Sequence, residues 1–194
     1  KDAALLPLLM DLQTDQVMLA RLTEKEYRDI SFLDQRIITP QLPRQLVEWD
    51  ELPAIPLPRL PKPHYIFHIG HVGSTLISRL LGEHESVFAL REPAILRQFS
   101  ELYVAGPSME TRWDAHKIHT RLRQVQNWLS RTFHTDQKSM IKASSFVSPL
   151  AKSLLGEEGD GLFLYASLER YLQTILAGES SLQEAEALAD LRLM

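Results

Sequence analysis

The sequence contains no cysteine among its 194 residues. Disulfide bonds, thiolate nucleophiles and thiolate zinc sites are therefore excluded, and the absence fits a reducing compartment such as the cytoplasm. The sequence also lacks any apolar run near the roughly 20 residues that a membrane span requires. With no evident secretory signal peptide either, we expect a soluble, cytoplasmic protein with no membrane span.

There is no excess of positive charge. The 21 Lys and Arg residues are outnumbered by 25 Asp and Glu residues, which gives a formal net charge of −4. The basic field that attracts nucleic acid or an anionic membrane surface is missing, so we expect neither as a partner. An anionic ligand must then be held by a local site. The sequence is compatible with a homo-oligomer.

Proline, in contrast, is concentrated in one place, because seven of the 11 prolines fall within residues 40–63. This density excludes regular helix and central strand, and the apolar residues between the prolines indicate an extended strap packed on the main domain. Upstream, Thr23 and Glu26 form a capping-box pattern, and residues 1–38 are expected to be helical. We therefore expect residues 1–63 to be a helical, Pro-rich extension. Residues 64–194 are expected to be the core, which could be incomplete at its C-terminus.

After Pro63, segments with the pattern of strands alternate with segments that have the pattern of helices. The alternation predicts an α/β fold, in which a central parallel sheet lies between two layers of helices in a three-layer α/β/α arrangement. Gly82 is expected to end the first of these helices in a left-handed conformation. The expected strands are 65–69, 87–90, 139–143 and 162–166, and the expected helices are 74–81, one entered through Pro93, 111–133, one starting at Ser148, 168–177 and 181–191.

Residues 67–76, FHIGHVGSTL, run from the first of these strands into a helix through a glycine-containing loop. Glycines let backbone amides converge, and a helix N-terminus adds unpaired donors and the positive end of its dipole. Ser74 and Thr75 can add hydroxyl donors. The spacing and the missing lysine exclude a Walker A loop. We favour an anion site here over a tight turn with no ligand.

The run HIGHVGSTLISRLL at residues 68–81 resembles the 5′-phosphosulfate loop of P-loop sulfotransferases. The resemblance covers roughly residues 64–178 and continues with Glu92 after the second strand and Lys142 on the third. It implies a P-loop-containing, nucleotide-hydrolase-like core of the sulfotransferase type. It also implies a nucleotide-binding enzyme that transfers a sulfuryl group from 3′-phosphoadenosine-5′-phosphosulfate to a hydroxyl or amine of a small molecule or biopolymer.

The resemblance also implies roles for single residues, and it implies no metal. Lys142 and His71 would stabilise the transferring sulfuryl group, with Glu92 as the base. His71 departs from the lysine or arginine usual in the loop, and Ala166 stands where the family's second signature has an arginine for the 3′-phosphate. Thr174 keeps the hydroxyl of that signature, and Arg170, one helical turn before it, could substitute for the arginine. The alternative is that both are ordinary residues of a helix surface. The residues expected to hold the 5′-phosphosulfate are Gly70, His71, Val72, Gly73, Ser74 and Thr75.

Other interpretations compete with this one. The chain could be a nucleotide-dependent small-molecule kinase, or a catalytically degenerate nucleotide-binding or assembly module. Glu92 could simply favour the N-terminus of the following helix through its dipole. His116 and His119 share a helical face, but no third ligand at metal spacing accompanies them. His64 and His68, four residues apart on a buried strand, are expected to be satisfied core residues.

Overall fold

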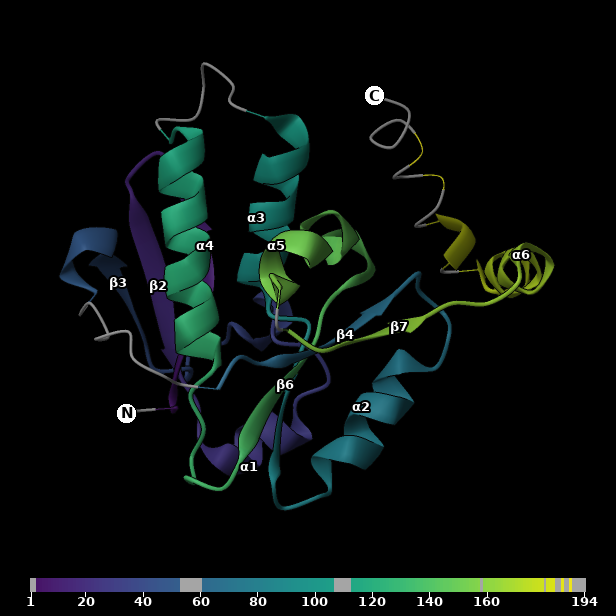
Figure 1. Ribbon diagram of the computed structural model, residues 1–194, viewed down its shortest axis with the longest axis horizontal. Helices are drawn as coiled ribbons and strands as arrows, with labels where there is room; N and C mark the ends of the chain where they lie inside the picture. Colours follow the sequence, from purple (N-terminus) through teal and green to yellow (C-terminus); the bar gives the residue numbers. More distant parts are fainter. Residues whose placement is uncertain are drawn as a thin grey trace.

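The computed structural model describes residues 3–52, 61–106, 113–157, 159–179, 181–183, 186 and 189. These residues form two sheets, an antiparallel one in the order β1-β2-β3 and a parallel one in the order β5-β6-β4-β7 (Figure 1). The strands are β1 (Leu5–Asp11), β2 (Gln16–Arg21), β3 (Arg44–Glu48), β4 (His64–His68), β5 (Val87–Arg91), β6 (Lys138–Lys142) and β7 (Gly161–Leu164). The α-helices are α1 (Glu24–Asp29), α2 (Ser74–Gly82), α3 (Ala94–Ala105), α4 (Ala115–Leu129), α5 (Ala151–Leu155) and α6 (Leu168–Ala177).

The parallel sheet confirms the expected α/β class. The middle of β4 is apolar and buried, at Tyr65, Ile66 and Phe67, because helices cover both faces of such a sheet. Helices α1 and α2 lie on one side of it and α3, α4 and α5 on the other (Figure 1). The arrangement is compatible with a three-layer α/β/α fold.

The prediction of a helical region at residues 1–38 is wrong for its first part. β1 and β2 form a hairpin there, whereas the capping box of Thr23 and Glu26 does start α1 as expected. Along β2, buried Val17 and Leu19 lie on either side of the less buried Met18, which is the period of a strand. Pro7 cannot occupy a helix interior, and the ladder shifts register between Pro7 and Leu9.

The proline-rich stretch contributes an edge strand rather than an extended strap alone. β3 pairs with β2 and lies at the end of its sheet, where prolines on either side do not interrupt a ladder. Trp49 and Leu52, which follow β3, are buried in the core as expected of the apolar residues in this stretch. The other apolar residues of this stretch, within residues 53–60, lie outside the described residues.

Gly82 does not end α2 in a left-handed conformation, contrary to prediction. It lies within the helix, and a Cβ placed on it would come within 2.9 Å of the Ala89 Cβ, so this glycine permits α2 to approach β5 closely. The expected helix at 111–133 is shorter, since α4 spans Ala115–Leu129 and residues 111 and 112 lie outside the described residues. In the expected helix at 181–191, the described residues 181–183, 186 and 189 are helical.

One hydrophobic cluster joins the two sheets. It contains Leu8 and Val17 from the hairpin together with Phe67, Phe99 and Leu122 from the core. At the other end of the molecule, α6 has no buried residue and stands apart from the other helices (Figure 1). In the described part of the chain, every helix is too short or too polar to cross a membrane.

Candidate functional site

The loop after β4 lies where the order of the parallel strands changes direction. β4 is flanked by β6 on one side and β7 on the other, and the chain leaves β4 for β5 beyond β6. In open α/β sheets, ligands bind outside the carboxyl ends of the strands at such a point. The topology therefore favours a ligand site at residues 69–75.

The loop itself is held in an unusual backbone conformation. Gly70, His71 and Gly73 have φ angles of 92°, 52° and 77°. His71 is notable because a residue with a Cβ rarely adopts a positive φ. A Cβ built on Gly70 or Gly73 would meet no atom within 4 Å, so these glycines serve the backbone conformation and the loop borders open space.

This conformation leaves a group of backbone donors free at the start of α2. The amide of Ile77 donates to the Gly73 carbonyl at 3.1 Å. Among the described residues, no acceptor meets the amides of residues 71–76. Convergent free amides at a helix N-terminus are an anion-binding arrangement, which the adjacent hydroxyls of Ser74 and Thr75 can extend.

A cavity of about 440 Å³ adjoins the loop and contains the charged residues that the sequence singled out. Lys142, only 1% exposed, forms an ion pair with the Glu92 carboxylate. The Glu92 amide also donates to the Lys142 carbonyl at 2.7 Å, and Glu92 has a φ of 52°. These two residues follow or end adjacent parallel strands, so their meeting at one sheet edge is a consequence of the topology.

The N-terminal region supplies another wall of this cavity, which the sequence did not predict. Phe32, Asp34 and Arg36 line it, and the Arg36 guanidinium lies 4.1 Å from the centroid of the Phe32 ring. Burial by itself would raise the pKa of Asp34, but hydrogen bonds from Arg36 outweigh it and lower that pKa. Their place in the cavity depends on how the N-terminal region packs, for which the sequence offers no local signal.

His68 also lines the cavity, contrary to the expectation that it is a satisfied core residue. It ends β4 at the carboxyl edge of the sheet, and Nε2 has no hydrogen-bond partner among the described residues. Its position as the last strand residue before the loop is the signal that could have identified it. His64, at the opposite end of β4, is half-buried and lies 3.5 Å from a carboxylate oxygen of Asp160.

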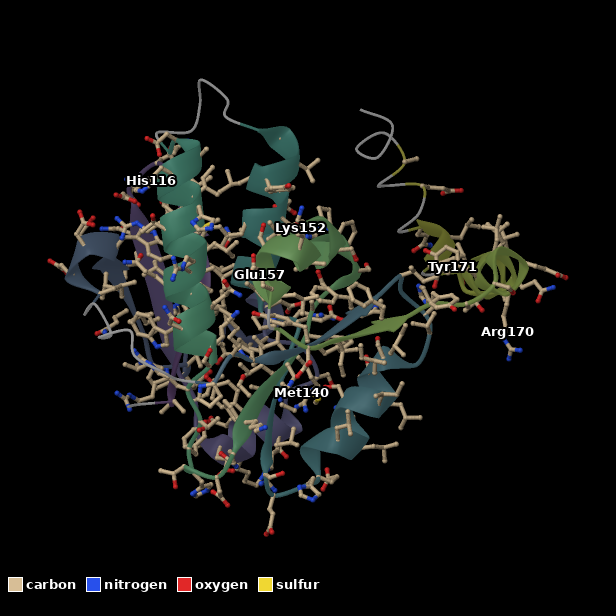
Figure 2. The ribbon with its side chains drawn as sticks, viewed as in Figure 1. His116, Met140, Lys152, Glu157, Arg170 and Tyr171 are labelled. Atoms are coloured by element: carbon tan, nitrogen blue, oxygen red, sulfur yellow. The ribbon has the colours of Figure 1, made fainter. Side chains whose placement is uncertain are left out.

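Arg170 and Thr174 lie on a second hollow, an open groove of about 730 Å³ along α6. His71 lines both this groove and the cavity, so the two hollows meet at the loop. Arg170 extends from α6 into open space (Figure 2). The Thr174 hydroxyl donates to the Arg170 carbonyl at 2.9 Å, which leaves its oxygen to accept but not its proton to donate. Ala166 is absent from the described lining of either hollow.

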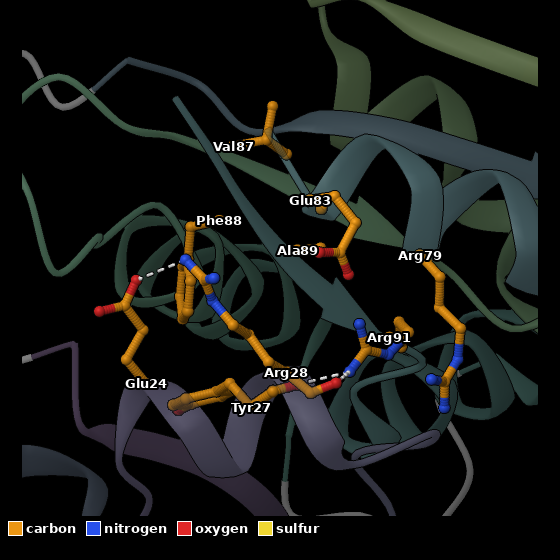
Figure 3. A pocket seen from close by; sticks show the side chains of 10 residues that line it. Glu24, Tyr27, Arg28, Arg79, Glu83, Val87, Phe88, Ala89 and Arg91 are labelled. Carbon is orange, nitrogen blue, oxygen red and sulfur yellow. Dashed lines mark hydrogen bonds and ion pairs between the residues drawn. The ribbon is translucent and has the colours of Figure 1, made fainter. Parts of the chain in front are cut away.

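A further hollow, shown in Figure 3, is structural. It holds only about 30 Å³, roughly one water molecule. Beside it, buried Arg91 donates to the carbonyls of Arg28 and Ile30, at 2.8 and 2.9 Å, where α1 ends. Arg91 therefore joins α1 to the parallel sheet, and the hollow is too small for a substrate.

Metal ligation finds no support in the described residues, where no three His, Asp or Glu side chains are grouped to hold an ion. His116 and His119 both lie on α4, and His116 is seen near its start in Figure 2.

Scans of the chain against protein-family models, curated proteins and solved structures return no significant match. The conclusion about function therefore rests on the loop, the Lys142–Glu92 pair and the two hollows that meet at His71.

Proposed function

We propose that the protein is an enzyme of the P-loop sulfotransferase type, which transfers a sulfuryl group from 3′-phosphoadenosine-5′-phosphosulfate to a hydroxyl or amine acceptor. The observation that carries the proposal is a single cavity lined by a loop with free amides, by a buried lysine and by a carboxylate. The amides suit the phosphosulfate, the lysine suits the charge of the transferring group, and the carboxylate suits the acceptor proton. This combination is what an in-line transfer between two oxygens requires.

The donor would lie across both hollows. Its phosphosulfate would occupy the cavity, on the amides of residues 71–76, and its nucleoside would extend past His71 into the groove along α6. There Arg170 is the cation available for the 3′-phosphate, and the Thr174 oxygen can accept from the ribose or the base but cannot donate to a phosphate. The net charge of −4 does not oppose such an anion, because local amides and cations supply the attraction.

In the proposed reaction, the bond between sulfur and the bridging oxygen breaks, and its electron pair stays on the 5′-phosphate. The acceptor oxygen or nitrogen forms the new bond to sulfur and gives its proton to Glu92. Lys142 pairs with Glu92 when no anion is bound. A shift of the ammonium toward the sulfuryl oxygens would free the carboxylate to accept that proton, so donor binding itself would activate the base.

Calorimetric titration with 3′-phosphoadenosine-5′-phosphate tests the donor site. We expect binding that weakens by about tenfold or more in Arg170→Gln, since a phosphate loses a charged partner. Lys152→Gln, a change of an exposed cation on α5 away from both hollows, serves as the control. No binding at millimolar nucleotide would overturn the proposal. Magnesium-dependent binding of ATP in its place would favour the kinase.

Transfer is tested with the sulfated donor and a panel of simple alcohols, phenols and amines. Glu92→Gln should retain nucleotide affinity within a few-fold while losing transfer by about 100-fold or more, because it removes a general base and not a phosphate ligand. Equal transfer by this variant and the wild type would contradict the role of Glu92. Nucleotide binding without transfer to any acceptor would favour the degenerate module.

A further inference from the structure

The His68 ring is enclosed in the cavity next to the loop. Its side chain is only 6% exposed, and Nε2 lies 3.9 Å from the nearer Glu92 carboxylate oxygen, too far for a hydrogen bond. No described residue accepts from Nε2 or donates to it. Buried polar atoms are nearly always paired, so an unpaired one in a residue that lines a cavity needs an explanation.

The other ring nitrogen fixes the position of the proton. Nδ1 accepts a hydrogen bond from the Gly70 amide at 3.0 Å, so it carries no proton. In a neutral imidazole the proton must then be on Nε2, which makes the unpaired atom a donor. The left-handed turn at Gly70 and the tautomer of His68 are thus coupled.

The ring is also uncharged at neutral pH. Burial lowers the pKa of His68 to about 4, and the positive charges of Lys142 and His71 act in the same direction. An interaction with the Ala143 backbone, whose geometry is not that of a normal hydrogen bond, opposes the shift but does not cancel it. His68 therefore offers a donor that adds no charge to a cavity already containing the Lys142 ammonium.

We propose that the Nε2–H group of His68 donates a hydrogen bond to a terminal oxygen of the anionic group held between the loop and the Lys142–Glu92 pair. If the proposed function is correct, that atom is a sulfuryl oxygen of the donor. His68 would then be a ligand of the transferring group, positioned by the same loop amide that shapes the anion site. A purely structural role, in which His68 only secures Gly70, requires Nδ1 alone.

Two substitutions separate these roles. The oxygen of an asparagine side chain can take the place of Nδ1, and the amide nitrogen of glutamine can reach the place of Nε2. His68→Asn thus keeps the contact with Gly70 and loses the ligand donor, whereas His68→Gln keeps the donor. His64→Gln, on the same strand but outside both hollows, is the matched control.

The wild type and the three variants are titrated calorimetrically with the sulfated donor and with 3′-phosphoadenosine-5′-phosphate, which lacks the sulfuryl group. Thermal unfolding of each variant is recorded in parallel. We expect His68→Asn to weaken binding of the sulfated donor by about tenfold or more and to affect the desulfated nucleotide less. His68→Gln and His64→Gln should stay within about threefold of the wild type by the same reasoning.

Equal affinity of His68→Asn and His68→Gln for the sulfated donor would overturn the inference and leave the proposed function standing. Equal losses for both nucleotides would likewise assign His68 to loop structure. A wild-type protein that binds neither nucleotide would overturn both proposals. If His68→Asn does not fold, the ¹⁵N resonances of the wild-type ring replace it, since a proton on Nε2 that shifts on addition of donor supports the inference and an unchanged resonance contradicts it.

Discussion

Among single residues, His68 has an effect that extends beyond the cavity, because burial of its ring makes the stability of the protein depend on pH. Its pKa is lowered to about 4, whereas the unfolded chain has a pKa near the reference value of about 6.5. Between these values the unfolded state binds more protons, so the free energy of unfolding decreases as the pH falls from about 6.5 to about 4. From pH 7 to pH 5, we expect His68 alone to account for a loss of about 2 kcal/mol.

Urea denaturation at pH 7 and pH 5 measures this loss. His68→Gln cannot titrate, so its stability should fall less over the same interval, by about the amount assigned to the histidine. A pH dependence that is identical in His68→Gln and the wild type would show that the ring is not held neutral.

At the scale of elements, Arg91 determines how α1 attaches to the parallel sheet. Its guanidinium is buried and donates to carbonyls at the end of α1, where the helix leaves these acceptors unpaired (Figure 3). Arg91→Met would leave the carbonyls buried and unsatisfied, and we expect the free energy of unfolding to drop by about 3 kcal/mol. Arg28→Met is the control, because its exposed pair with Glu24 is worth only about 0.5 kcal/mol. Chemical denaturation gives both values, and equal losses would contradict the prediction.

Helix α6, in contrast, has no buried residue. Its apolar residues Leu168, Leu172 and Leu176 are spaced on one helical face, yet all are exposed. Leu172→Glu and Leu176→Glu should therefore change the free energy of unfolding by less than about 0.5 kcal/mol. Leu96→Ala, in the fully buried part of α3, should cost about 3 kcal/mol. A comparable loss in the α6 variants would mean that this face is covered in solution, and sedimentation velocity would then test whether a second copy covers it.

At the scale of the whole molecule, the N-terminal region and the core depend on each other. Asp15, in the turn of the hairpin, accepts from Trp113 Nε1 at 3.1 Å and from Lys117 Nζ at 2.8 Å. The hairpin also contributes Leu8 and Val17 to the shared hydrophobic cluster. We expect the fragment 64–194 to lack cooperative thermal unfolding and dispersed amide resonances, because its apolar surface would be left uncovered. A fragment that unfolds cooperatively like the full chain would contradict this expectation.

Much of the geometry of the candidate site follows from sequence order. The loop at residues 70–75, Glu92 and Lys142 each follow or end a predicted strand, and parallel strands present their carboxyl ends at one sheet edge. His68 was missed because an unpaired nitrogen is a property of the finished cavity and not of a strand pattern. Asp34 and Arg36 were missed because nothing local indicates that a segment 30 residues upstream of the core folds over its sheet edge.

Local periodicity and backbone preference suffice to predict the α/β class, the strands of the parallel sheet and the glycine-containing loop. Tertiary contacts determine that residues 5–21 are a hairpin and that Gly82 serves close packing against Ala89. The same contacts pair the Lys142 ammonium with Glu92 and place the ring proton of His68 on Nε2. The physical reason is that burial and pairing are set by contacts between distant segments. The absence of cysteine, of long apolar runs and of excess positive charge excludes whole classes of protein. The local electrostatic field that an anion requires forms only when distant segments of the chain meet.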